Sequence, residues 1–155
     1  MTSSQPARAA VRPKEFHFPL SVEWTGGRRV AALAEGKPAV EVAPPPVFRG
    51  TDPELWSPEE LLVGSAGACL AVTFTGLAQR AGLPYRRLRV DGDGVCGRRD
   101  DGRFGFTRIH LRVELETEPE HAAQARELAE EAEAQCLVSA SLALPVEVEI
   151  RVGGE

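Results

Sequence analysis

The feature that most constrains this fold is an uncharged segment, because no Asp, Glu, Lys or Arg occurs between residues 61 and 78. Helix-start signals precede this segment. Ser57 suits an N-cap, and Glu60 stands at the spacing of a capping box. Gly82 follows as a helix-stop signal. We therefore expect one helix that runs from Pro58 to about Ala81.

The uncharged segment is also long enough for a marginal membrane span. It is rich in Gly, Ala, Ser and Thr, however, rather than in large aliphatic residues. A helix that is apolar on all sides suits the centre of a large soluble core, and its glycines let another backbone approach closely. We therefore reject the membrane interpretation and expect a buried helix in a core that two subunits share.

Alternating apolar and polar residues predict six strands around this helix, at residues 16–24, 29–35, 39–43, 85–97, 104–117 and 146–152. A second helix is expected from Pro119 to about Ser141, with Cys136 on its apolar face. The order of three strands, helix, two strands, helix and strand predicts one α+β domain. We place this domain at residues 16–152 and expect a disordered tail at residues 1–15.

Composition excludes several classes of function. The net charge is -5, which argues against a nucleic-acid partner, whose phosphates need clustered Lys and Arg. Three cysteines are too few for a secreted disulfide scaffold, and no signal peptide is visible, so we expect a cytoplasmic protein. No Cys/His spacing suggests a zinc site and no glycine pattern suggests a phosphate site, so we expect no metal or cofactor.

Two cysteines carry the chemistry that the sequence suggests. Cys69 lies in the uncharged helix and Cys136 in the second helix. In a reducing compartment a pair of thiols tends to be catalytic, redox-active or metal-binding. Taken by themselves, the two are either unrelated core residues or an attacking and a resolving pair. Cys96, near a hairpin end, is either a reactive surface thiol or an incidental residue.

Two charged residues bracket the turn into the first helix. In one interpretation Arg49 is a solvated loop residue and Glu59 is a charge that suits the start of a helix. In the other interpretation both residues belong to a functional site. In the second interpretation Arg49 supplies positive charge to a thiolate, and Glu59 orients Arg49 or accepts a proton. Trp56, just before the helix, is a core or interface residue or helps to line an apolar pocket.

The chain resembles a known family in three motifs: Phe48-Arg49-Gly50, Pro58-Glu59-Glu60-Leu61-Leu62 leading to Ala68-Cys69, and Cys136-Leu137-Val138-Ser139. Together they resemble the OsmC/Ohr family of thiol-dependent peroxidases, over roughly residues 16–152. Because Arg49 stands just before the Pro-Glu-Glu helix, the resemblance favours the OsmC branch. It implies an OsmC-like fold, with antiparallel sheets wrapped around long central helices in an intertwined homodimer.

The resemblance also implies a reaction, the reduction of organic hydroperoxides and, less efficiently, of hydrogen peroxide. Cys69 would be the peroxidatic nucleophile, which releases an alcohol and becomes a sulfenic acid. Cys136 would resolve that sulfenic acid as an intramolecular disulfide, which a small dithiol or a lipoylated protein then reduces. Arg49 would stabilise the thiolate, and Glu59 would hold and steer Arg49.

Two departures from the family pattern keep an alternative open. The second motif is usually Cys-Pro-Val-Ser, and Leu137 stands at the proline position, which bears on how the helix presents Cys136. Residues 63–67 also lack the histidine or aromatic residue often found near the first cysteine. The alternative is a non-catalytic protein of the same fold that binds a hydrophobic small molecule or senses thiol oxidation.

Helix geometry separates two of these residues within one chain. Ten residues at a rise of ~1.5 Å put Glu59 about 15 Å from Cys69 along a straight helix. Either the helix breaks, or Glu59 and Arg49 serve the Cys69 of a partner subunit, and we hypothesise the second.

Overall fold

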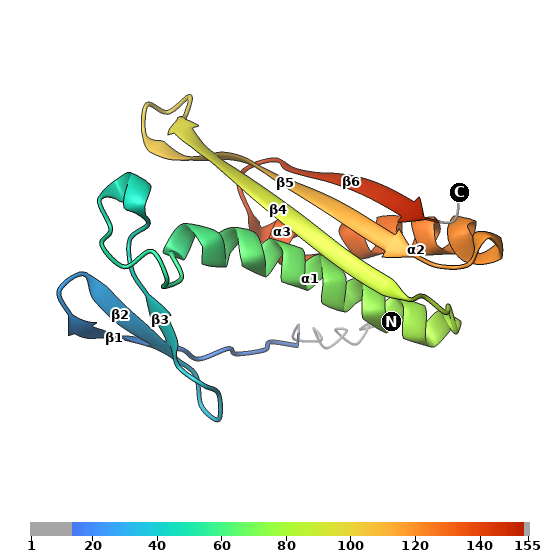
Figure 1. Ribbon diagram of the computed structural model, residues 1–155, viewed down its shortest axis with the longest axis horizontal. Coiled ribbons are helices and arrows are strands. Elements are labelled where there is room, and N and C mark those ends of the chain that lie inside the picture. The colour runs from blue at the N-terminus through green and yellow to red at the C-terminus, as the bar shows by residue number, and fades with distance from the viewer. Residues whose placement is uncertain (1–13, 154–155) are drawn as a thin grey trace, which may run out of the picture.

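Two three-stranded sheets and one long helix organise the computed structural model, which describes residues 14–153 (Figure 1). The first sheet contains β1 (Ser21–Gly26), β2 (Arg29–Leu33) and β3 (Val40–Val42), and the second contains β4 (Arg87–Arg98), β5 (Phe104–Glu116) and β6 (Val146–Gly153). The helices are η1 (Pro46–Phe48), α1 (Pro58–Ala81), η2 (Pro119–His121), α2 (Ala122–Ala134) and α3 (Leu137–Ser141). Most of the tail expected at residues 1–15 lies outside the described residues.

The bounds predicted for α1 are confirmed, and its caps explain them. The Ser57 hydroxyl accepts from the backbone N–H of Glu60, and the Glu60 carboxylate accepts from the backbone N–H of Ser57. This is the reciprocal capping box that the sequence predicts. At the other end Gly82 is left-handed, with φ 66°, and donates to the carbonyls of Ala78 and Gln79.

One side of α1 is buried and the other is open. The second sheet and α2 pack on the buried side, where β4 crosses the helix (Figure 1). This side carries Ala66, Leu70, Phe74, Leu77 and Ala78. On the open side Val72 is 70% exposed. By length and composition α1 would suffice to cross a membrane, and 28% of its apolar stretch is buried. The expected burial on all sides is therefore not reached within one chain.

The inner face of the second sheet forms the rest of the core. Along β5, as predicted, the buried residues alternate with polar ones, and they are Ile109, Leu111, Val113 and Leu115. β4 and β5 are antiparallel, but β6 runs parallel to β5, so the expectation of purely antiparallel sheets is wrong for this pair. The physical reason is the connection: a crossover through α2 and α3 returns the chain to the same end of the sheet.

A bulge near the tip of the β4–β5 hairpin changes which side chains face the helix. Val95 pairs with Arg108 and Cys96 pairs with Phe106, so Thr107 is the extra residue on β5. The Thr107 hydroxyl donates to the carbonyl of Val95. Because side chains alternate along a strand, this extra residue moves Phe106 onto the inner face, where it packs against the core.

The first sheet projects from the start of α1, away from the second sheet (Figure 1). β1 begins at Ser21 rather than at residue 16, because its partner β2 ends at Leu33, opposite Ser21. The sheet is tied to the helix entrance by Trp56, whose carbonyl accepts from the backbone N–H of Ala43. Ala31 and Val42 of this sheet are buried, whereas Val22 and Trp24 of β1 remain in solvent, with Trp24 74% exposed.

The second helix is not continuous, so the prediction of one helix over residues 119–141 is wrong. α2 ends at Ala134, and Cys136 adopts an extended backbone (φ -67°, ψ 106°) before α3 begins. Cys136 is therefore the N-cap of α3 rather than a residue on a helix face. The change of direction buries Cys136 to 1% exposure and lets Val138 and Leu142 pack against the core, while Leu137 stays outside.

Close packing of α1 on β4 generates a first prediction. A Cβ at Gly92 would lie 2.6 Å from Cγ1 of Val63. We expect Gly92→Ala to lower the free energy of unfolding by about 1–3 kcal/mol, because overpacking forces the helix and strand apart. Urea denaturation checks this. Gly97→Ala is the matched control, since its Cβ meets nothing closer than 3.7 Å and the change should cost much less. Equal losses in the two variants would contradict the prediction.

The break at Cys136 generates a second prediction. Leu137 is the first residue of α3, a position that tolerates proline, and Cys136 already has the extended backbone that a following proline requires. We expect Leu137→Pro to change the free energy of unfolding by less than about 1 kcal/mol. The control is Ala140→Pro, which removes the N–H that donates to the Cys136 carbonyl and should cost several times more. A large loss with Leu137→Pro would show that the break depends on leucine.

Candidate active site

The fold brings Cys69 and Cys136 together. α1 presents Cys69, half-buried, about three turns after its start, and the break before α3 places Cys136 in the core beside it. Both thiols are free, and Cys69 lies close enough to Cys136 to lower the pKa of the Cys136 thiol. The Cys136 sulfur also lies 4.0 Å from the carbonyl oxygen of Ala66, one turn earlier on α1. Two residues 67 positions apart therefore form one pair.

The surroundings of Cys136 favour its thiolate despite its depth. Burial acts to raise the pKa of this thiol, but hydrogen bonds from Ser139, from Cys69 and from the backbone of Val138 outweigh burial, and the pKa lies below its ordinary value. The Ser139 hydroxyl donates to the sulfur over 3.2 Å. From the sequence, Ser139 is recognisable only as part of a motif, because its contact with Cys136 depends on the turn of α3.

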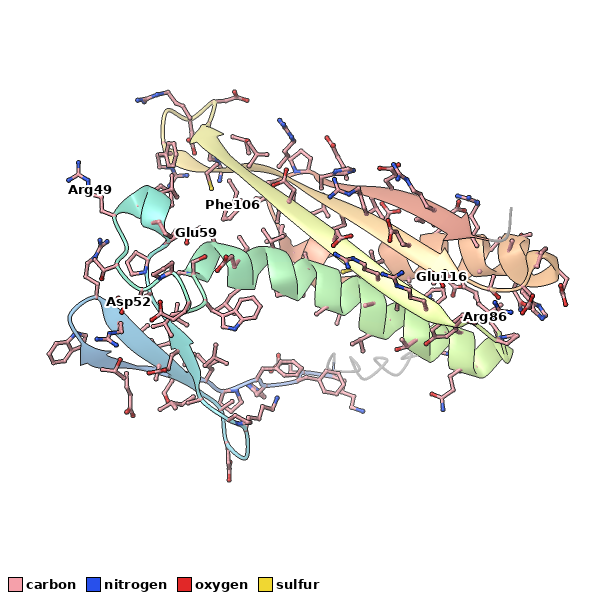
Figure 2. The ribbon with its side chains drawn as sticks, in the orientation of Figure 1. Arg49, Asp52, Glu59, Arg86, Phe106 and Glu116 are labelled. Atoms are coloured by element: carbon pink, nitrogen blue, oxygen red, sulfur yellow. The ribbon has the colours of Figure 1, made fainter. Side chains whose placement is uncertain are left out.

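Arg49 and Glu59 do not meet within one chain. Arg49 follows η1 in a left-handed conformation, with φ 61°, and its exposed side chain points away from Glu59 (Figure 2). Glu59 lies in the first turn of α1, and its Oε2 atom is buried without a hydrogen-bond partner among the described residues. Their roles toward a thiolate therefore remain predictions.

A residue that the sequence analysis missed holds the loop of Arg49. The Arg28 guanidinium, from the turn between β1 and β2, donates to the carbonyls of Phe48 and Arg49, each over 3.2 Å. Arg28 and Glu59 also line the same small cavity of about 280 Å³. No sequence signal identifies this contact, because 20 residues separate Arg28 from Phe48 and the turn that carries Arg28 is ordinary in composition.

A larger cavity of about 730 Å³ opens between η1, the start of α1 and the tip of the β4–β5 hairpin. Its wall is mainly apolar and aromatic and includes Trp56, which confirms that residue as a pocket-lining one, together with Phe48, Val63, Phe104 and Phe106. Phe106 and Glu59 both line it and lie close to each other in Figure 2. Cys69 and Cys136 do not line this cavity, although Gly67 and Ala68, which directly precede Cys69 on α1, do.

The third cysteine also lines the larger cavity. Burial, followed by the negative charge of Glu59, raises the pKa of the Cys96 thiol. A neutral thiol is a poor nucleophile, so Cys96 differs chemically from the pair at Cys69 and Cys136. Within residues 14–153 no group of three or more His, Cys, Asp or Glu side chains is placed to hold a metal ion.

The chain matches one protein family in sequence. The family described as OsmC-like protein matches residues 50–151. A curated relative, the uncharacterized protein YmaD of Bacillus subtilis, is 26% identical over an alignment of 150 residues that covers 91% of this chain and 99% of YmaD.

Solved structures resemble the fold as a whole. An OsmC-like protein of unknown function from Vibrio cholerae gives a TM-score of 0.79 at 17% identity, over 88% of this chain and 100% of that one. An organic hydroperoxide resistance protein from Elizabethkingia anophelis gives a TM-score of 0.71 at 21% identity, over 92% of this chain and 99% of that one. The organic hydroperoxide resistance protein OhrB of Bacillus subtilis gives a TM-score of 0.63 at 20% identity, over 88% of this chain and 98% of that one. The OsmC-like α+β fold expected for the single chain is confirmed, and the chain belongs to the OsmC-like protein family.

Proposed function

We propose that this protein is a cytoplasmic thiol-dependent peroxidase that reduces organic hydroperoxides to alcohols. The observation that carries the proposal is the pair of free thiols, Cys69 on α1 and Cys136 at the N-cap of α3, which lie close enough for Cys69 to lower the pKa of Cys136. Relatives of the same fold that are named organic hydroperoxide resistance proteins support it.

The difference in burial between the two thiols suggests their roles. Cys69 is half-buried and Cys136 is 1% exposed, so a peroxide from solvent meets Cys69 first. The Cys69 thiolate attacks the peroxide oxygen, the O–O bond breaks, and the alcohol leaves with one proton while Cys69 becomes a sulfenic acid. Cys136 then attacks the Cys69 sulfur, a disulfide forms and water leaves. A small dithiol or a lipoylated protein returns two electrons and two protons.

Exposed apolar surfaces and the buried carboxylate oxygen of Glu59 support a homodimer in which a second chain completes the site. The open side of α1 and the first sheet expose large apolar side chains, among them Val22, Trp24 and Val72. Glu59 keeps a buried oxygen without a described partner, and α1 separates Glu59 from the Cys69 of its own chain. We propose that Glu59 and Arg49 of each subunit serve the Cys69 of the other.

The larger cavity favours a second candidate function, the binding of a hydrophobic small molecule without turnover. A volume of about 730 Å³ with aromatic walls suits such a ligand, and neither thiol of the proposed pair lines it. The two candidates differ in what peroxide does to the chain. A stoichiometric dose of cumene hydroperoxide removes two hydrogens and links Cys69 to Cys136 in a peroxidase, whereas a binding protein keeps its mass.

The peroxidase proposal predicts a specific set of variant activities. With tert-butyl hydroperoxide and dihydrolipoamide, wild type turns over and Cys69→Ser does not, because the nucleophile is gone. Cys136→Ser retains partial turnover if an external thiol replaces the resolving step. Cys96→Ser is the matched control and keeps its turnover, because Cys96 carries no electrons in the proposed reaction. Absence of turnover in wild type with both dithiol and monothiol reductants would favour the binding function.

The shared site predicts complementation between two inactive variants. Light scattering should give twice the chain mass of 16.7 kDa. Co-expressed Cys69→Ser and Glu59→Ala chains should regain about a quarter of wild-type activity, because half of random dimers are mixed and each mixed dimer has one intact site. As a control, Cys69→Ser is co-expressed with the double variant Cys69→Ser/Glu59→Ala, which should regain nothing. A monomer, or no regain in the mixed dimers, would defeat the shared site.

A further inference from the structure

We propose that Ser139 is a positioning residue that makes Cys136 the leaving group when the Cys69–Cys136 disulfide is reduced, so that the external dithiol attacks Cys69. The inference rests on the proposed function, because it concerns the disulfide which that function generates. It assigns to Ser139 a role in the regeneration of the enzyme rather than in the attack on peroxide.

Access distinguishes the two sulfurs. Cys136 is 1% exposed and is enclosed by α1 on one side and by the first turn of α3 on the other. Cys69 is only half-buried, and Ala68 beside it is exposed and lines the larger cavity. Thiol–disulfide exchange needs a thiolate to approach one sulfur along the S–S axis. A reductant from solvent therefore reaches Cys69 and not Cys136.

The hydrogen bonds distinguish the sulfurs in the same direction. Ser139 donates its hydroxyl to the Cys136 sulfur over 3.2 Å, and the backbone of Ser139 and Val138 adds further donors. The titratable group that acts on this sulfur among residues 14–153 is Cys69 itself. A thiol with a lowered pKa leaves faster in exchange, so the donors of α3 favour cleavage toward Cys136.

The step balances with a dithiol as the two-electron reductant. A thiolate of the dithiol forms a bond to the Cys69 sulfur, the Cys69–Cys136 bond breaks, and its electron pair passes to Cys136, where Ser139 donates a hydrogen bond. The second thiol of the dithiol then attacks the other dithiol sulfur, which is bonded to Cys69, and the Cys69 thiolate is released. The two protons of the dithiol end on Cys69 and Cys136, and the reductant leaves as a cyclic disulfide.

The experiment starts from the disulfide itself, so that it does not depend on peroxidase turnover. The wild-type chain is oxidised with diamide, treated briefly with 2-mercaptoethanol, quenched in acid and labelled with N-ethylmaleimide. Peptide mass spectrometry should find the mercaptoethanol mixed disulfide on Cys69 and the maleimide on Cys136. A mixed disulfide on Cys136 would overturn the inference.

Kinetics test the part played by Ser139. In stopped flow, dihydrolipoamide should reduce the disulfide of Ser139→Ala about three- to tenfold more slowly than that of wild type. This factor in rate corresponds to the loss of one hydrogen bond to a leaving thiolate. Ser139→Thr keeps the hydroxyl and should stay within about twofold of wild type. Ser141→Ala, a matched change at an exposed position of the same helix, should equal wild type.

A second readout separates this role from a merely structural one. In a Cys69→Ser/Cys96→Ser background, thiolate ultraviolet absorbance against pH reports the pKa of Cys136. Adding Ser139→Ala should raise the pKa of Cys136, whereas adding Ser141→Ala should leave that pKa unchanged. Unchanged reduction rates and an unchanged pKa in Ser139→Ala would overturn the inference and leave the peroxidase standing. If diamide forms no Cys69–Cys136 disulfide, both the inference and the proposed resolving step fail.

Discussion

The structure depends on one packing constraint, the close contact of α1 with the inner face of the second sheet. Gly92 and Gly94 on β4 let the strand approach Val63 so closely that a Cβ at either position would overlap it. This approach holds the sheet on the first turns of α1 and places the bulge, with Phe106, over the helix entrance. The larger cavity and the position of Glu59 beside it follow from that contact.

The break in the second helix determines the chemistry of the proposed site. A continuous helix would carry Cys136 as one more residue of an alanine-rich face. Breaking at Cys136 instead buries the sulfur against α1 and surrounds it with donors from the first turn of α3. Burial and hydrogen bonding act in opposite directions on this thiol, and the donors prevail. A thiol buried without such donors would be inert.

Several groups in the single chain have no partner that fits their chemistry. Large apolar residues of the first sheet, such as Val22 and Trp24, lie in solvent, and one side of α1 is open. Glu59 has a buried carboxylate oxygen without a hydrogen-bond donor among the described residues. Uncompensated groups of this kind cost free energy, so several of them in one chain mark a surface that functions when covered. A second copy of the chain would cover them and would unite residues that one chain holds apart.

The sequence by itself determined what is local. The capping box at Ser57, the glycine after Ala81 and the alternation along β5 specify α1 and the core strands through neighbouring residues alone. Cys69 and Cys136 could be named from motifs, but their contact could not, because it depends on where the second helix breaks. Tertiary structure alone decided that break, the bulge that turns Phe106 inward, the bonds of Arg28 and Ser139, and the separation of Arg49 from Glu59. These features arise from packing between segments far apart in the chain, which no local pattern encodes.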